Sequence, residues 1–417
     1  MTSSSTRATG FVAPLLPLFL LAAALTACGG GAGTATDSAL PTGSTLTAAE
    51  PPPALVAGEA TMPHSTSAGS QTLQTLGSLA DGGHAVAWLS TAAQGPVLQV
   101  QRFDGAGRRL GGEAGIPLDA SMEPRAVALL PDGSVVLAFV TMGPATREQP
   151  WITRTAVVVR RYDTDGLRVG ADMEVAAVEQ DRIDPQVMRY LDAPALARWD
   201  DGGFVLAWTL VEEDTSGKRP RFWAQRFGRE GQPAGAPQQV AAAELDTAHR
   251  VIAAAGGGWI LVTEHRVMGR AYVRYHGRDG AAVPALPGGA MGFAEGSLLV
   301  PLYGGRSLLV APVKNYGAWQ LYGADGQPVG PGGTLQQAPV AATALRDGGW
   351  VLFEPGTTTG SLQAVRFDPT GRPAGPALGL QARPPLQGVP LADGGVAIGW
   401  DVSGRDGLPD VMTQRLR

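Results

Sequence analysis

The chain has 417 residues, of which 44% are hydrophobic and 17% charged, and its formal net charge is −5. This acidic balance gives no electrostatic basis for binding nucleic acid, so that class of function is excluded. The chain contains a single cysteine, which excludes an internal disulfide.

The N-terminal segment has the features of an export signal. Polar residues and one positive charge, Arg7, precede an apolar run over 11–25 that is too short to predict a transmembrane helix. The run leads into Leu-Thr-Ala-Cys at 25–28, which resembles the lipobox of bacterial lipoproteins. The resemblance implies that residues 1–27 are a signal peptide and that Cys28 is lipidated. An ordinary signal peptide followed by an incidental free cysteine is the alternative.

The residues after Cys28 bear on the choice of membrane and on the distance from it. Asp directly after the lipidated cysteine resembles an inner-membrane retention signal of Gram-negative lipoproteins, and this chain has Gly29 there. The resemblance therefore implies a cell-envelope protein of a Gram-negative bacterium, anchored in the outer membrane, with the leaflet left open. Residues 28–53 consist mostly of Gly, Ala, Thr, Ser and Pro, which predicts a flexible tether of roughly 30 Å. The folded domain is expected over 54–417.

One repeated pattern organises residues 54–417. An Asp-Gly pair follows a short apolar run and precedes a second, alternating run, and this hairpin signal predicts a type I′ turn. After a variable segment, a third run ends in a basic–aromatic pair such as Arg102-Phe103, followed by a second turn and a fourth run. Clear copies of the first turn begin at Asp81, Asp132, Asp201, Asp347 and Asp393, and degenerate copies begin at Gly256 and Tyr303.

Four strands in each unit of roughly fifty residues, repeated about seven times, predict an all-β fold, a single β-propeller of seven four-stranded blades, with six or eight as alternatives. The units resemble the Asp-Gly-Gly repeats of many bacterial secreted and surface proteins. The last unit ends at Arg417 after its third strand, which would expose a sheet edge. Residues 54–62 resemble the fourth strand of the first unit, 110–116, so we predict that they complete the last blade and close the ring.

The repeated polar residues have a structural and a functional interpretation. The Asp-Gly carboxylates could bind calcium, but turn formation through local backbone N–H groups is favoured. The arginines of the third strands could line a polyanion site, but hydrogen bonds to carbonyl or carboxylate groups between blades are favoured. These arginines are Arg102, Arg161, Arg226, Arg274, Arg366 and Arg415.

The sequence shows no catalytic constellation. Its five histidines lack a metal-ligand spacing, and no Gly-x-Ser-x-Gly elbow is present. The Asp-Gly-Gly turns resemble sialidase turns only superficially, because the Ser two places before the Asp is missing in every copy. The blade pattern of quinone-dependent dehydrogenases is missing as well. We therefore predict no catalytic residue, no metal and no cofactor; enzyme activity is left open, with a non-enzyme favoured.

Three long insertions point to a binding surface. They are predicted as loops over 141–154, 211–222 and 176–194, and the propeller topology places all three at one end of neighbouring blades. Candidate partner-binding residues there are Trp151, Arg147, Arg182, Glu212, Glu213, Asp214 and Arg219. Trp151 is the expected anchor, because aromatic residues dominate interface energetics, and the charges would form a rim around it. Neutral surface insertions are the alternative.

These features predict a lipid-anchored envelope propeller that binds or scaffolds another protein and contacts the membrane through its anchor. In architecture alone it resembles the outer-membrane assembly propeller lipoproteins. The alternative is a carbohydrate-binding or glycan-hydrolysing propeller, with Trp151 and Trp223 as the nearest aromatic candidates. The sequence identifies neither the protein partner nor a small-molecule or glycan ligand.

Overall fold

The computed structural model describes most of the chain beyond residue 53. The described residues are 54–65, 69–92, 95–119, 126–148, 150–181, 187–242, 247–253, 258–265, 270–281, 293–294, 296–313, 316–323, 327–358, 360–404 and 407–417. The chain divides into two compact units, Met1–Glu50 and Pro51–Arg417, and the first lies outside the described residues. Every regular element in the described ranges is a β-strand, so none of them is a helix that could span a membrane.

The strands of each sheet are consecutive in the sequence, and each sheet is one blade. Blade 1 contains β1 (Ser70–Ser78), β2 (His84–Ala92), β3 (Gly95–Phe103) and β4 (Arg109–Pro117). Blade 2 contains β5 (Ala126–Leu129), β6 (Val135–Pro144), β7 (Ile152–Tyr162) and β8 (Arg168–Asp181). Blade 3 contains β9 (Met188–Arg198), β10 (Phe204–Asp214), β11 (Gly217–Phe227) and β12 (Gln238–Ala242).

The remaining blades follow the same order. Blade 4 contains β13 (Thr247–Ala253), β14 (Trp259–His265), β15 (Arg270–His276) and β16 (Phe293–Ala294). Blade 5 contains β17 (Leu298–Pro301), β18 (Ser307–Val313), β19 (Tyr316–Tyr322) and β20 (Pro328–Leu335). Blade 6 contains β21 (Ala341–Ala344), β22 (Trp350–Pro355), β23 (Leu362–Phe367) and β24 (Leu378–Leu380). Blade 7 contains β25 (Leu386–Pro390), β26 (Val396–Ser403) and β27 (Pro409–Leu416).

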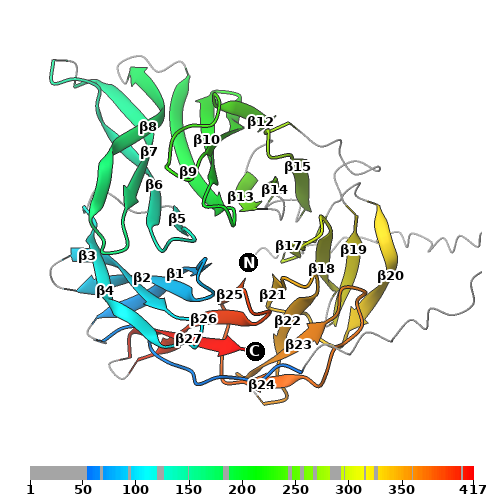
Figure 1. Ribbon diagram of the computed structural model, residues 1–417. Coiled ribbons are helices and arrows are strands. Elements are labelled where there is room, and N and C mark those ends of the chain that lie inside the picture. The colour runs from blue at the N-terminus through cyan, green and yellow to red at the C-terminus, as the bar shows by residue number, and fades with distance from the viewer. Residues whose placement is uncertain are drawn as a thin grey trace, which may run out of the picture. The chain divides into compact units, whose positions relative to one another are not determined.

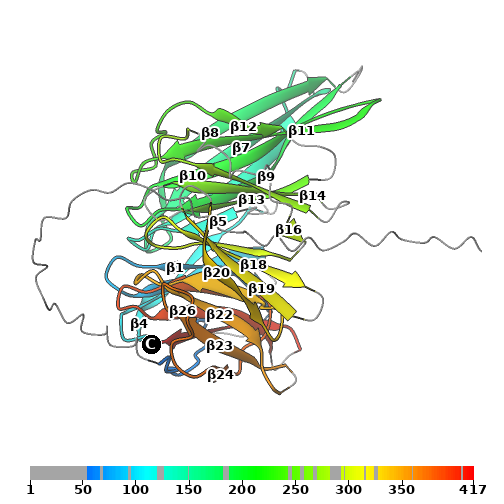
Figure 2. The ribbon, with the colours of Figure 1, turned by 90° about the vertical axis from the view of Figure 1, so that its right-hand side faces the viewer.

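The seven sheets of the described residues surround a central axis as the blades of a propeller (Figure 1). The first strand of each blade lies nearest the axis, and the last strand lies at the rim. Neighbouring strands in a blade are antiparallel, as in the pairs β1–β2 and β2–β3. Figure 2 shows the ring from the side, with strands of blades 2 and 3 reaching beyond it. The predicted all-β propeller with seven blades is confirmed.

Apolar packing between blades holds the ring together. Within the described residues there are seven hydrophobic clusters, and each joins two neighbouring blades. One of them packs Trp88 and Val86 of blade 1 against Ala397 and Val411 of blade 7, so the ring closes through a hydrophobic contact. Successive side chains of a strand point to opposite faces of its sheet. Because neighbouring blades cover both apolar faces, the side chains on both sides are buried.

An aromatic stack recurs inside the blades, between the first residue of the second strand and the last residue of the third. The ring centroids of His84 and Phe103 lie 4.7 Å apart with an interplanar angle of 6°. Those of Phe204 and Phe227 lie 4.7 Å apart at 9°. The same positions hold the stacked pairs Trp259–His276 and Trp350–Phe367. At the first position of the pair, blade 1 therefore has a histidine where the other three blades have Phe or Trp.

The Asp-Gly pairs form the turns between the first and second strands. The Asp81 carboxylate accepts a hydrogen bond from the Gly83 N–H at 2.9 Å, and Gly82 has a φ of 88°. Leu79 N–H donates to the Gly83 carbonyl at 2.9 Å, so three residues lie inside the turn. The predicted two-residue type I′ turn is wrong: positive φ falls on Gly82, as in a turn that ends in a glycine bulge. The predicted turn-forming role of the carboxylate is confirmed.

The arginines of the third strands bind protein groups within and between blades. Arg161 donates to the Glu230 carbonyl of the next blade. Arg366 donates to the Asp347 carboxylate at 2.7 Å, at the turn of its own blade. Arg226 and Arg415 make the equivalent bonds to the Arg278 carbonyl and the Asp393 carboxylate. The structural interpretation is confirmed for these four arginines, but the predicted bonds between blades are found only for Arg161 and Arg226, since Arg366 and Arg415 bond within their own blades.

The segment at the N-terminal end of the ring completes blade 7, as predicted. Backbone hydrogen bonds join Val56 to Arg417 in both directions, at 2.7 and 2.9 Å, and join Thr61 to Thr413 in both directions at 2.8 Å. Leu55 is 6% exposed and belongs to the hydrophobic cluster of blades 6 and 7. The pairing appears as antiparallel bridges on β27 rather than as one continuous strand. It covers the sheet edge that the C-terminal strand would otherwise expose.

Deleting residues 54–62 should therefore destabilise the ring. The deletion removes the backbone hydrogen bonds to β27 and the burial of Leu55, which together contribute at least about 3 kcal/mol to the free energy of unfolding. Thermal unfolding followed by circular dichroism measures the effect. Deleting residues 29–50 instead is the control and should leave the midpoint nearly unchanged. Equal losses from both deletions would mean that the N-terminal segment does not close the ring.

His84 should make folding sensitive to mildly acidic pH. Its side chain is 2% exposed, and burial, followed by the charge of Arg415, lowers its pKa from 6.5 to about 4. In the folded state His84 stays neutral down to about pH 4, whereas in the unfolded chain it is protonated below about pH 6.5. Stability is therefore lost as the pH falls from 6.5 to 4, by roughly 2–3 kcal/mol from this group.

His84→Phe should remove that contribution while keeping the stack, because Phe204 and Phe227 already form the same pair in blade 3. Denaturant unfolding of the wild type and the variant at pH 7.0 and pH 4.5 measures it. We expect similar stability at pH 7.0 and a higher stability of the variant at pH 4.5. Parallel losses in the two proteins would show that His84 does not cause the acid sensitivity.

Candidate functional site

Blades 2 and 3 carry β-hairpins that extend beyond the ring (Figures 1 and 2). In blade 2, β6 and β7 pair as far as Pro144 and Thr153, and β8 continues beside β7 to Asp181. In blade 3, β10 and β11 pair as far as Asp214 and Gly217. We call these outer parts of β6–β8 and β9–β11 the blade 2–3 extension.

The prediction that 141–154, 176–194 and 211–222 are loops is largely wrong, because most of these residues lie in strands. The physical reason is that a long insertion between antiparallel strands can satisfy its backbone N–H and C=O groups by prolonging the ladder. The expected placement at one end of neighbouring blades is correct, since Gln180 at the end of β8 accepts a hydrogen bond from the Arg189 N–H at 2.8 Å. The insertions therefore form a sheet-built projection rather than adaptable loops.

The predicted binding residues fall at two tips of this extension. Trp151 lies between β6 and β7 with 42% of its surface exposed, and Arg147 is exposed in the same turn. Met142 on β6 and Met188 on β9 are exposed as well. Arg182 lies outside the described residues. The tip of blade 2 thus presents an aromatic and a flexible apolar side chain to solvent.

The acidic residues predicted for the rim lie at the tip of blade 3, and each is paired with a basic side chain. Glu212 accepts a hydrogen bond from Arg221 at 2.8 Å and lies 3.2 Å from Arg189. Asp214 accepts from the Ser216 hydroxyl and backbone and from Arg219, and these bonds hold the pKa of its carboxyl below the usual value. Glu213 completes the set through Lys218, at 3.5 Å.

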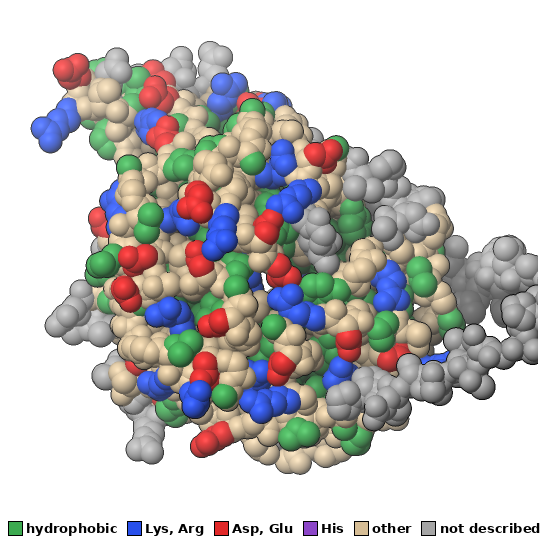
Figure 3. Space-filling view, viewed as in Figure 1, with side chains coloured by type: hydrophobic (Ala, Val, Ile, Leu, Met, Phe, Trp, Pro, Cys, Tyr) green, Lys and Arg blue, Asp and Glu red, His purple; other side chains and the backbone are tan. Residues whose placement is uncertain are grey.

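Such exposed pairs contribute little to stability, but they leave the tip polar and nearly neutral. Figure 3 shows side chains of both charges gathered on the projecting end, with apolar side chains between them. Among the described residues, no group of His, Cys, Asp and Glu has the arrangement that a metal ion requires.

A second candidate site, which sequence reasoning missed, is a cavity of about 610 Å³ on the axis of the ring. It is lined by the inner strands β1, β9, β13, β17, β21 and β25. Most of its wall is apolar, with Leu76, Ile252, Leu299, Val300 and Val389 among the lining residues. Figure 3 shows the hollow at the centre of the ring. Its volume is typical of small-molecule sites.

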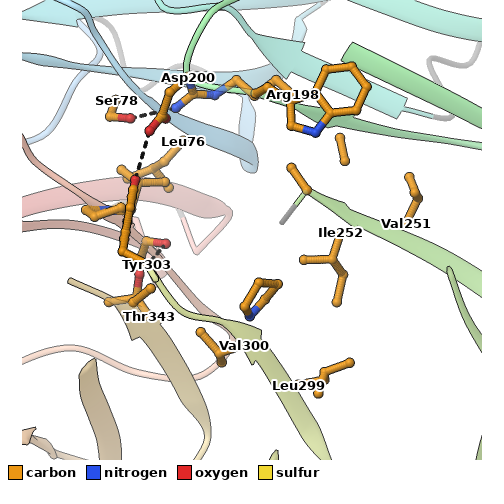
Figure 4. A pocket seen from close by; sticks show the side chains of 18 of the residues that line it. Leu76, Ser78, Arg198, Asp200, Val251, Ile252, Leu299, Val300, Tyr303 and Thr343 are labelled. Carbon is orange, nitrogen blue, oxygen red and sulfur yellow. Dashed lines mark hydrogen bonds between the residues drawn. The ribbon is translucent and has the colours of Figure 1, made fainter. Parts of the chain in front are cut away.

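One end of this cavity is polar because blade 3 sends side chains across the axis (Figure 4). The Arg198 guanidinium donates to the Ser78 hydroxyl of blade 1 at 2.7 Å. The Asp200 carboxylate accepts from the Tyr303 hydroxyl of blade 5 at 3.0 Å and from Arg346 of blade 6 at 3.3 Å. These bonds join blades that are not neighbours in the ring, so they tie its far sides together.

The electrostatics of this polar end follow from its burial. Burial, followed by the negative charge of Asp200, raises the pKa of Tyr303 to about 12, so its hydroxyl remains a donor at neutral pH. Burial lowers the pKa of Arg198, against the opposing effect of Asp200. The Arg346 guanidinium also lies over the Tyr303 ring, 5.5 Å from its centroid. A second ion pair, Arg278 with Asp201, lies at the same end.

A signal for this site does exist in the repeat. Asp200, Tyr303 and Arg346 occupy one repeat position, the residue before the turn pair, where other blades have Ala80, Pro131 and Ala392. The bond from Leu302 N–H to the Arg306 carbonyl matches that from Leu79 to Gly83, so Gly304 corresponds to Asp81. The sequence analysis had aligned Tyr303 with Asp81, whereas Tyr303 corresponds to Ala80. It therefore missed that three blades share a polar residue at that position.

No family model matches the sequence, and no curated protein matches it either. Solved structures similar to the chain include a prolyl endopeptidase, with 14% identity, a TM-score of 0.49 and coverage of 83% of this chain and 47% of that chain. The polysaccharide lyase Uly1 has 12% identity and a TM-score of 0.45 over 84% of this chain and 90% of that one. The Dos1 propeller has 10% identity and a TM-score of 0.39 over 87% and 94%.

The chain thus spans about half the length of the prolyl endopeptidase. At these identities the likeness concerns the propeller fold alone. Propellers host unrelated activities, so the fold does not select among them.

Proposed function

We propose that the protein is a lipid-anchored cell-envelope propeller that binds another protein through the blade 2–3 extension. The observation that carries the proposal is the exposure of Met142 and Met188 on strands of the extension and of Trp151 in the turn between β6 and β7. Leu191 and Val178 of the extended strands pack in the hydrophobic cluster between blades 2 and 3, whereas Trp151, Met142 and Met188 do not belong to it. Aromatic and Met side chains are enriched at the centres of protein interfaces, and paired charges are typical of their rims.

The proposed anchor precedes the ring in the chain. The lipobox ending at Cys28 and the tether that follows supply the proposed attachment to the outer membrane. The ring begins at residue 54, next to Leu55, which packs against blades 6 and 7. In a ring of seven blades, that place is opposite blade 3 (Figure 1). The first residues of the ring and the blade 2–3 extension therefore lie on opposite sides of the ring.

The carbohydrate alternative has less support from the extension. A sugar site needs exposed aromatic faces, and Trp223 is only partly exposed, because it packs against the hydrophobic cluster of blades 2 and 3. Trp151 is then the exposed tryptophan of the described extension, and a single aromatic face is a weak platform for a glycan. The proposed function is therefore protein binding, with a glycan array as the direct test of the alternative.

Trp151→Ala should weaken binding of the partner by tenfold or more, because truncating an aromatic anchor costs about 2 kcal/mol. The measurement uses a photo-crosslinking amino acid at Met142 of the full-length protein in intact envelopes, followed by capture and identification. The crosslinked band should fade in Trp151→Ala, and the thermal midpoint should stay within about 2 °C of the wild type because the side chain lies outside the core.

The matched control is Tyr316→Ala, since Tyr316 is 43% exposed on blade 5 and Trp151 is 42% exposed. A crosslinker at Val329 of the same blade should give no specific product. A band that persists in Trp151→Ala, or one that disappears equally in Tyr316→Ala, would remove the extension as the binding surface.

Cys28→Ala should abolish lipidation, because Cys28 carries the only thiol in the chain. Metabolic labelling with a radioactive fatty acid, followed by membrane fractionation, measures this. The wild type should be labelled and sediment with outer membranes, whereas the variant should be unlabelled and retain its signal peptide. Equal labelling of the two proteins would contradict the lipoprotein assignment.

A further inference from the structure

The polar end of the central cavity contains a positive charge that the protein does not neutralise directly. Arg278 is paired with Asp201, and Arg346 is paired with Asp200. Arg198, in contrast, donates to the neutral hydroxyl of Ser78. Among the described residues that line this end, it is the guanidinium without an ion pair. Arg198 and Arg278 line the cavity, and Arg346, outside the lining, pairs with Asp200. With Arg278 paired to Asp201, these groups leave one positive charge, on Arg198, at a partly buried position.

Holding a guanidinium at such a place is costly unless its charge and its donors are satisfied. The lowered pKa of Arg198, caused mainly by burial, reports the same unfavourable environment. Arginine remains protonated at neutral pH, so the chain cannot relieve this cost by releasing the proton. Asp200 lies close enough to reduce it, but its carboxylate already accepts from Tyr303 and Arg346.

The groups around Arg198 can receive a carboxylate. A guanidinium has five N–H donors in a planar fork, which matches the two oxygens of a carboxylate. The Ser78 hydroxyl accepts from Arg198, so its own O–H is available to donate to a second acceptor. Beyond this polar end, Leu76, Ile252 and Val300 continue the wall of the cavity as an apolar surface (Figure 4).

We propose that the central cavity binds a small organic monocarboxylate with an apolar body. The carboxylate pairs with Arg198 and Ser78, and the apolar body lies against the inner strands. One uncompensated guanidinium selects a monoanion over a phosphate dianion, and the apolar wall selects an organic acid over an inorganic ion. This site lies on the axis of the ring and is separate from the blade 2–3 extension, so it does not depend on the proposed protein binding.

The probe is 4-phenylbutanoate, compared with its neutral analogue 4-phenylbutanol, its cationic analogue 4-phenylbutylamine and inorganic phosphate. Calorimetric titration uses the full-length protein in detergent, with protein-free detergent as the reference for partitioning. We expect binding of the carboxylate that is at least tenfold tighter than that of the alcohol or of phosphate, and no binding of the amine. Equal affinities for the acid and the alcohol would overturn the proposal.

Three variants test the site at single positions. Arg198→Gln should weaken 4-phenylbutanoate at least about tenfold, since it removes the charged donor. Asp200→Asn should strengthen it severalfold, because it removes the competing negative charge. Ile252→Trp should weaken the carboxylate by filling the apolar part of the cavity.

The matched control is Arg108→Gln, because Arg108 is an exposed arginine paired with Asp104 away from the cavity, and it should leave binding unchanged. Thermal unfolding identifies variants that fail to fold. If Arg198→Gln does not fold, the affinities of Asp200→Asn and Ile252→Trp for 4-phenylbutanoate still test the proposal. Unchanged or weaker binding in Asp200→Asn, or unchanged binding in a folded Arg198→Gln, would refute the assignment.

Discussion

Closure of the ring is the constraint on which every other feature of this structure depends. Each blade has two apolar faces, and only its neighbours cover them. A break between blades 7 and 1 would expose one face of each together with the edge of β27. The antiparallel bonds from Val56 and Thr61 to β27, and the packing of Trp88 against Val411, remove all three exposures at once. The two ends of the folded unit must therefore meet.

A closed ring also fixes distances across its axis, which separate domains or open sheets could not do. Asp200 on blade 3 reaches Tyr303 on blade 5 and Arg346 on blade 6 because packing around the rim sets the positions of the inner strands. The same packing holds Arg198 at a partly buried place where its charge is not directly paired. The stability of the scaffold thus compensates for a local electrostatic cost, which is typical of binding sites.

The repeat separates positions that build the ring from positions that are free to vary. The turn carboxylates and the third-strand arginines bond to backbone or to each other in several blades, as Asp347 and Arg366 do. The blades differ from one another at the residue before the first turn and in the length of the hairpin formed by their second and third strands. Both candidate sites lie at such departures: the polar end of the cavity at the first, and the blade 2–3 extension at the second. Variation on a repeated scaffold is therefore the best guide to function here.

The sequence alone determined the all-β class. It favoured seven blades over six or eight, a turn-forming role for the Asp-Gly carboxylates over calcium binding, and closure by 54–62, because these depend on patterns that recur at a fixed spacing or on a strand missing from the last unit. It also located the insertions that contain Trp151. It did not determine that those insertions are strands, since hydrogen bonding across a hairpin depends on pairing partners that a local pattern does not specify. Nor did it reveal the cavity at Arg198. Its polar end combines two residues of blade 3 with one residue each from blades 1, 5 and 6, and only the closed ring brings them within hydrogen-bonding distance.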